Sequence, residues 1–139
     1  MLEYKSLPKV IEHLEFLGYE VEQTPSEGNP HQFIARHASR PYLLVNPIRN
    51  VGLSVVSLYT LNAEKVNKNR LKALEIINKA SYNAVICAFS IPENAVNFAC
   101  ATTYVGEYNK KQFADFLELF EGDINRALNG NVDLIELSK

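Results

Sequence analysis

The segment 83–104 constrains the fold most, because two apolar alternating runs flank a short turn in NAVICAFSIPENAVNFACATTY. Folding it about residues 93–94 makes the numbers of opposite residues sum to 187 and gives four pairs: Ile91 with Val96, Phe89 with Phe98, Cys87 with Cys100, and Val85 with Thr102. Because side chains alternate across a strand, these pairs share one bulky face. The segment predicts a β-hairpin, and this register requires Cys87 and Cys100 to be cross-strand neighbours.

The opposite face of the predicted hairpin carries small, weakly apolar residues, namely Ile86, Ala88, Ser90, Asn97, Ala99, Ala101 and Thr103. Such a flat face packs against water, against a closely approaching helix, or against a second copy of itself. A solvated face is as well supported as a contact, because apolar atoms are normal on protein surfaces. As a contact surface it would comprise Ile86, Ala88, Ala99, Ala101 and Thr103.

Composition narrows the class of protein. The chain has 139 residues, of which 47% are hydrophobic and 22% charged, so we expect a single globular domain over residues 1–139. The net charge of −2 and the interrupted basic cluster at residues 65–72 argue against nucleic-acid binding. No apolar run approaches the length of a membrane span, and the N-terminus lacks a signal-peptide pattern. We therefore expect a cytoplasmic protein.

The first half of the chain predicts one helix followed by strands. Ser6 precedes an apolar run at helical spacing that ends at Gly18, a residue suited to a left-handed C-terminal position. Short strands are expected at residues 19–24 and 32–37, on either side of an exposed loop at residues 25–30. Stronger strands are expected at 42–46 and 53–61, joined through 47–52. The last of these is apolar on both faces, which predicts a place inside the sheet.

Two further helices are expected. Asn62 caps a middle helix that runs to about residue 81 and whose buried face comprises Val66, Leu71, Leu74, Ile77 and Ala80. Asn109, Gln112 and a Tyr108 to Phe113 contact specify the start of the closing helix. Its apolar side comprises Phe113, Phe116, Leu117, Phe120, Ile124 and Leu128. Asn129 and Gly130 end this helix, and residues 131–139 are expected to be a stray strand or a flexible, disordered tail.

These elements predict an α+β fold with an antiparallel sheet. The order is helix, three or four strands, helix, two strands and helix, which amounts to about five strands and three helices (α-β-β-β-α-β-β-α).

No sequence motif supports a particular reaction. The chain has no glycine-rich phosphate loop, no Gly-x-Ser-x-Gly elbow and no His-Glu-x-x-His pair. Cys87 and Cys100 are expected to be buried thiols. A redox pair is the alternative, but directly opposed strand residues make a strained disulfide and no Cys-x-x-Cys spacing is present. We therefore expect no catalytic residues, no cofactor and no metal, and hence not an enzyme.

The histidines and arginines suggest two further candidate sites, each with less support from the sequence. His31 and His37 would share one face of a regular strand, as a metal or proton-transfer site requires, but no third ligand accompanies them. His13 lies in the first helix. Three arginines, Arg36, Arg40 and Arg49, form either an anion site beside the loops or, as we favour, a solvated rim.

The chain resembles the bacterial YbjN-like proteins, which share the fold of type III secretion chaperones. Three segments carry this resemblance: 44–52 (LVNPIRNVG), 77–83 (INKASYN) and 96–104 (VNFACATTY). The resemblance covers most of residues 6–128. It rests on the order of the helices and strands and on loosely matching asparagine and apolar positions, not on an invariant motif. The resemblance implies a homodimer with a non-catalytic role in regulation or in holding a partner polypeptide, and it supplies no catalytic residues. The chain lacks the marked acidity of many such chaperones, which favours the regulatory role over a dedicated secretion role.

Two functions follow as hypotheses. The first is a homodimeric protein-binding or regulatory module that binds a protein or peptide partner, with the flat hairpin face and the middle helix as self-complementary surfaces. The alternative is a small-molecule-binding domain or weak enzyme with a cleft between the sheet and the loop at residues 25–30. That alternative predicts a deep pocket lined by converging polar groups.

Overall fold

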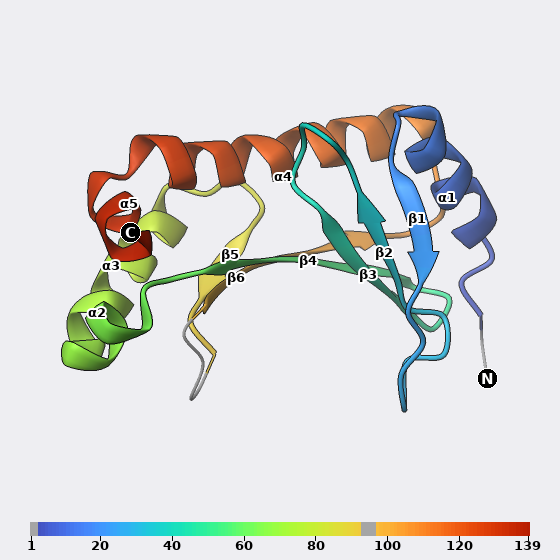
Figure 1. The fold of residues 1–139 in the computed structure, drawn as a ribbon. Coiled ribbons are helices and arrows are strands. Elements are labelled where there is room, and N and C mark those ends of the chain that lie inside the picture. The colour runs from blue at the N-terminus through green and yellow to red at the C-terminus, as the bar shows by residue number, and fades with distance from the viewer. Residues whose placement is uncertain (1–2, 93–96) are drawn as a thin grey trace. The chain divides into compact units, whose positions relative to one another are not determined.

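The structure is a computed structural model that describes residues 3–92 and 97–139. These residues form five helices and six strands (Figure 1), in the order α1 (Leu7–Phe16), β1 (Glu20–Gln23), β2 (Phe33–Arg36), β3 (Leu43–Ile48), β4 (Gly52–Thr60), α2 (Ala63–Lys68), α3 (Arg70–Tyr82), β5 (Ala88–Ser90), β6 (Asn97–Val105), α4 (Lys110–Gly130) and α5 (Val132–Ser138). The strands form one sheet in the order β1-β2-β3-β4-β6-β5. The predicted α+β class with an antiparallel sheet is confirmed, with one strand and two helices more than the sequence predicts.

The chain divides into two compact units. The first unit comprises Met1–Ser57 and Thr102–Glu118, and the second comprises Leu58–Ala101 and Leu119–Lys139. Strands β4 and β6 and helix α4 contribute residues to both units. The single domain expected over residues 1–139 stays a prediction.

In the first unit, α1 begins and ends where the sequence predicts. Its first residue follows Ser6, and Gly18 adopts a positive φ of 97° just beyond its end. Its inner face buries Val10 and Leu14 completely. The Ser6 hydroxyl does not cap the helix but accepts a hydrogen bond from the backbone N–H of Tyr108 at 2.9 Å. This bond joins the start of α1 to the residues that precede α4.

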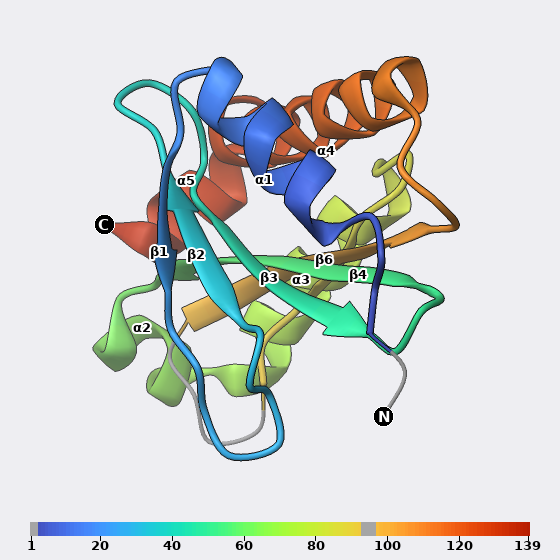
Figure 2. The ribbon, with the colours of Figure 1, turned by 90° about the vertical axis from the view of Figure 1, so that its right-hand side faces the viewer.

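Strands β1, β2 and β3 lie side by side in the first unit (Figure 2), and all four strands predicted before the middle helix are present. Phe33 lies opposite Val45, which lies opposite Val55 on β4. These three side chains are at most 2% exposed and form the centre of this core. Strand β4 has β3 and β6 as neighbours, which confirms its predicted place inside the sheet.

The connection between β3 and β4 is shorter than the predicted segment 47–52. Strand β3 continues through Pro47 and Ile48, so that Pro47 lies opposite Leu53 and Ile48 opposite Gly52. Only residues 49–51 remain for the turn, which Arg49 enters with a positive φ of 49°. A hydrogen bond from the backbone N–H of residue 51 to the carbonyl of Ile48 (3.0 Å) closes the turn.

In the second unit, Asn69 divides the predicted middle helix into α2 and α3. Asn62 and Asn69 each cap the helix that follows by accepting a hydrogen bond from a backbone N–H at 3.1 Å. The second cap restarts the helix in a new phase, so the predicted burial of Leu71 and Leu74 is wrong: their exposed fractions are 69% and 41%. The buried side chains of the two helices are Val66, Ala73, Ile77 and Ala80.

The register of the β5–β6 hairpin differs from the predicted one. Phe89 lies opposite Cys100 rather than Phe98, a shift of two residues from the predicted pairing. Cys87 is therefore not the cross-strand partner of Cys100, and the predicted pairing is wrong. A shift of two residues nevertheless keeps each side chain on the same face, because the side-chain period of a strand is two. The same residues therefore share a face as predicted, although the predicted pairing is wrong.

Burial agrees with these two faces along most of the hairpin. Five of the seven described positions of the bulky face are buried, whereas Val85, before the start of β5, is 63% exposed and Thr102 is partly buried; the buried five are Cys87, Phe89, Ile91, Phe98 and Cys100. On the flat face, Ala88 and Ser90 are exposed. The predicted turn at residues 93–94 and the predicted partner Val96 lie outside the described residues. The register prediction depended on that turn alone, whereas the faces depended on the alternation along each strand.

The closing helix α4 begins as predicted. Asn109 caps it by accepting a hydrogen bond from the backbone N–H of Gln112 at 3.0 Å, and the rings of Tyr108 and Phe113 are 5.9 Å apart. Four of the six predicted apolar side chains are buried (Phe113, Leu117, Phe120 and Ile124), and the other two, Phe116 and Leu128, are partly buried.

The C-terminal residues form a helix, so the predicted stray strand or disordered tail is wrong. Asn131 caps α5 by accepting a hydrogen bond from the backbone N–H of Leu134 at 3.0 Å. Leu134 and Leu137 are buried, and the carbonyl of Leu137 accepts a hydrogen bond from the backbone N–H of Asn62. Two buried leucines and this hydrogen bond to the start of α2 hold α5 within the second unit.

Candidate functional site

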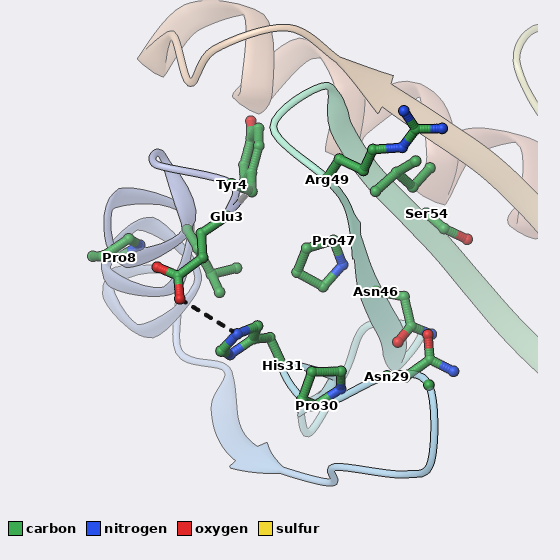
Figure 3. Close-up of a pocket in the computed structure, with 13 residues that line it drawn as sticks. Glu3, Tyr4, Pro8, Asn29, Pro30, His31, Asn46, Pro47, Arg49 and Ser54 are labelled. Atoms are coloured by element: carbon green, nitrogen blue, oxygen red, sulfur yellow. Dashed lines mark ion pairs between the residues drawn. The ribbon is translucent and has the colours of Figure 1, made fainter. Parts of the chain in front are cut away.

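A cavity of about 700 Å³ lies in the first unit, beside the loop at residues 25–30 (Figure 3). Its walls come from the N-terminal segment and α1, from this loop, and from the β3–β4 hairpin. The cavity lies beside the loop where the small-molecule alternative expects a cleft. The lining residues are Glu3, Tyr4, Leu7, Pro8, Gly28, Asn29, Pro30, His31, Asn46, Pro47, Ile48, Arg49 and Ser54.

One polar pair and one buried acceptor define the chemistry of this cavity. Glu3 and His31 face each other across it, with Oε1 and Nε2 3.9 Å apart (Figure 3). Asn46 Oδ1 is buried and accepts no hydrogen bond from any described residue. A buried acceptor without a partner costs stability, so it is a position where a donor from a ligand would gain most. The Arg49 side chain points away from Glu3 and His31 (Figure 3).

Four rings form part of the cavity wall. Pro8, Pro30 and Pro47 approach it from three different segments, with Tyr4 above them (Figure 3). An apolar wall with a few placed acceptors and donors is the usual composition of a small-molecule site. The cavity is therefore suited to an organic molecule with an apolar body and an N–H group.

The predicted contact residues of the hairpin differ in exposure. Ala88 and Thr103 are exposed, Ile86 and Ala101 are partly buried, and Ala99 is buried with 8% of its surface exposed. Thr103 belongs to the first unit and the other four to the second. Ala88 lies directly opposite Ala101, so these two form the centre of the flat face. Their role as a contact surface stays a prediction.

Helix α3 carries an exposed apolar stripe that the sequence reading missed. Leu71, Leu74 and Tyr82 are spaced by three and eight residues, which places them on one side of the helix. Their exposed fractions are 69%, 41% and 89%. Sequence reasoning assigned the two leucines to the core because it did not break the helix at Asn69, whose capping tendency was the available signal. We call these three residues the α3 stripe.

A buried carboxylate holds the segment that leads into β5. Asp123, on α4, accepts hydrogen bonds from the backbone N–H groups of Val85 (2.8 Å), Ile86 (2.9 Å) and Cys87 (2.9 Å), and another from Arg126. Burial raises the pKa of Asp123, but these four hydrogen bonds outweigh it and hold the pKa below its usual value. The signal for this anchor in the sequence was the charged Asp123 next to the apolar side of the closing helix.

Both cysteines are free, buried thiols. Burial, followed by the charge of Asp123, raises the pKa of both thiols, that of Cys100 to about 12. Such thiols are poor nucleophiles, because the thiolate is the reactive form.

The three histidines have separate partners. His13 Nδ1 lies 2.7 Å from the Tyr108 hydroxyl, and burial followed by the charge of Lys110 lowers the pKa of His13. His37 Nε2 lies 3.1 Å from the carbonyl of Leu17, whereas His31 faces Glu3. Among residues 3–92 and 97–139, no group of three or more His, Cys, Asp or Glu side chains is placed to hold a metal ion.

The predicted arginine cluster is spread over different segments. Arg36, at the end of β2, pairs with Glu22 at 2.8 Å, Arg40 lies between β2 and β3, and Arg49 lines the cavity.

In the described part of the chain, none of the helices has the length and apolar character needed to cross a membrane.

No protein-family model and no curated protein matches the sequence. Two solved structures match the fold. YbjN from E. coli, described as "a putative transcription regulator", gives a TM-score of 0.67 at 11% identity, over 99% of this chain and 98% of YbjN. An uncharacterized protein from Methanothermobacter thermautotrophicus gives a TM-score of 0.70 at 13% identity, over 96% of this chain and 99% of that one. The resemblance to YbjN-like proteins is thus confirmed as a shared fold.

Proposed function

We propose that this protein, as a chain with the YbjN fold, is a non-enzymatic regulatory or binding module that acts as a homodimer and holds a partner polypeptide. The description of YbjN as "a putative transcription regulator" supports the class of function. The observation that carries the dimer is the α3 stripe, because exposed apolar residues grouped on one helix face are typical of protein contacts.

The charges around the α3 stripe are self-complementary. Two antiparallel copies of α3, related by a two-fold axis between residues 76 and 77, place Leu71 of one copy opposite Tyr82 of the second. The same arrangement places Glu75 of each copy beside Lys79 of the other. A two-fold interface repeats each such contact twice, so one favourable charge pair counts double. Glu75 and Lys79 are both exposed in the single chain and thus available for this pairing.

The flat hairpin face is the second surface of the proposed dimer. Helix α3 lies along β5, where the Ser81 hydroxyl accepts a hydrogen bond from the backbone N–H of Phe89 (2.9 Å) and donates one to its carbonyl (3.0 Å). Ala88, the residue before Phe89, is exposed. An alanine surface allows close approach of a second backbone, so Ala88→Arg is expected to weaken the dimer.

Light scattering coupled to size-exclusion chromatography tests the dimer at protein concentrations of tens of micromolar. We expect a dimer for the natural chain and dissociation for Glu75→Lys or Lys79→Glu, since each change creates like-charge contacts across the axis. The double variant Glu75→Lys/Lys79→Glu should regain the dimer. Lys68→Glu, outside the stripe, is the control. A monomeric natural chain would contradict the homodimer.

A second candidate function, small-molecule binding in the first unit, is favoured by the unpartnered Asn46 Oδ1 at the cavity wall. Thermal unfolding in the presence of a panel of cyclic amines and amides tests it, because a ligand that binds the folded state raises the Tm. Asn46→Ala should abolish such a rise, and Asn67→Ala, an exposed asparagine of α2, should not. The absence of any Asn46-dependent rise would remove this candidate.

A further inference from the structure

A second concave surface of the first unit lies between α1 and the start of α4. This α1–α4 groove has a volume of about 810 Å³ and is lined by Lys9, Glu12, His13, Phe16, Leu17, Tyr108, Lys110, Lys111 and Ala114. Phe16 is its most unusual member, because 86% of its surface is exposed. A free phenylalanine ring beside a groove marks a place where a partner would bury apolar surface.

The floor of the α1–α4 groove is a fixed cluster of rings. His13 packs edge-on against Tyr108 and Phe113, with ring centroids 5.7 and 5.1 Å away. The bond between His13 and the Tyr108 hydroxyl joins α1 to the residues before α4. Because this floor is held by both ring packing and a hydrogen bond, a ligand would meet a preformed surface, which lowers the entropic cost of binding.

Positive charge surrounds the groove. Three lysines line it against one glutamate. Lys111 pairs with Asp115 at 2.7 Å, whereas Lys9 and Lys110 form no ion pair with any residue of the described chain. Two uncompensated ammonium groups beside apolar rings are complementary to carboxylates carried on an apolar segment.

The start of α4 breaks an electrostatic preference of helices. Lys110 and Lys111 occupy its first two positions, and its first turn holds no acidic residue. Cations at this end of a helix are unfavourable, because the helix dipole is positive there. Residues that are unfavourable for the helix or strand that contains them tend to occur at functional sites. An acidic ligand would offset both the lysines and the dipole.

We propose that the α1–α4 groove binds an acidic segment of a partner polypeptide, which anchors an apolar side chain against Phe16. The proposal rests on the partner-binding part of the proposed function and not on the dimer. The phenylalanine ring and the groove supply the apolar contact, and Lys9 and Lys110 supply the charge contact.

Fluorescence anisotropy with the full chain tests this proposal. The probe is a short fluorescein-labelled peptide of Glu and Leu, and the matched probe has each Glu replaced by Lys. We expect saturable binding of the acidic probe and none of the Lys probe. Salt should weaken the binding of the acidic probe, because salt screens exposed charges. Phe16→Ala should weaken it about tenfold or more, as loss of a central aromatic anchor does. Lys110→Gln should weaken it several-fold, and Lys68→Gln, on α2 in the second unit, should leave it unchanged.

Four outcomes would overturn the proposal. They are equal binding of both probes, no saturable binding up to about 1 mM, binding that neither Phe16→Ala nor Lys110→Gln weakens, and binding to phosphatidylserine vesicles in place of the peptide. Circular dichroism of each variant shows that it is folded. Light scattering on the same samples reports the dimer separately, so a monomer that binds the acidic probe would contradict only the homodimer.

Discussion

The buried carboxylate of Asp123 accepts a hydrogen bond from the backbone N–H of Cys87 at 2.9 Å. The same side chain also holds the N–H groups of Val85 and Ile86. One carboxylate therefore satisfies three consecutive backbone donors at the entrance to β5. Without it these donors would need water or another acceptor within the second unit.

Replacing Asp123 with alanine should destabilise the protein by about 3 kcal/mol or more, because buried donors left without acceptors cost about 1–3 kcal/mol each. Urea denaturation measures this loss. Glu118→Ala, at an exposed position of the same helix, is the control and should change stability by less than about 0.5 kcal/mol. Equal stabilities for the two variants would show that the anchor contributes nothing.

The Asp123 anchor also makes stability depend on pH in the acid range. Its pKa is lower in the folded than in the unfolded chain, so the folded state binds fewer protons and gains stability above the unfolded pKa of about 3.9. This contribution should be complete near neutral pH and disappear as the pH falls through the lowered folded pKa. The stability difference between the natural chain and Asp123→Asn should therefore shrink on acidification, as urea denaturation at several pH values will show.

The thiols of Cys87 and Cys100 should react slowly with a disulfide reagent such as DTNB at pH 8. Both are buried, and the raised pKa of each keeps it protonated. Unfolding in guanidinium chloride should make two thiols react rapidly, and Asp123→Asn should speed the reaction of the folded protein by removing the negative charge beside them. Rapid labelling of the folded natural chain would contradict the burial of these side chains.

Gly52 is required where β4 passes the backbone of β6. A Cβ atom at this position would lie 2.1 Å from the carbonyl oxygen of Tyr104, far inside van der Waals contact. We expect Gly52→Ala to destabilise the protein by about 2 kcal/mol or more, because backbone atoms must move apart. Gly130→Ala is the matched control, since its Cβ meets no atom within 4 Å and it has no positive φ. Thermal unfolding of the two variants tests the difference.

Helix α5 should contribute to the core of the second unit. Leu134 is 1% exposed, so Leu134→Ala should cost about 2–4 kcal/mol through lost burial and the cavity left behind. Val132→Ala, in the same helix but 72% exposed, should cost much less. Chemical denaturation compares the two. If both changes had the same small effect, residues 132–138 would contribute no packing.

Local sequence signals predicted the elements whose ends are set by neighbouring residues. Gly18 ended α1, Asn62 capped α2, and Asn109 with Gln112 started α4, each as predicted. A cap or a left-handed glycine acts within one turn of the chain, so its effect is present in the sequence itself. Strand alternation likewise predicted which face of the hairpin is buried.

The sequence alone thus determined helix starts, strand positions and the two faces of the hairpin. Only the tertiary structure decided the β5–β6 register, because a shift of two residues leaves the alternation of each strand unchanged. It also decided that Asp123 is a buried anchor, that Leu71 and Leu74 are exposed, and that the C-terminal residues fold as a helix. Each of these depends on groups distant in the chain, whose positions local propensity and periodicity do not specify. The hairpin that most constrains the fold therefore has the predicted faces with different partners across them.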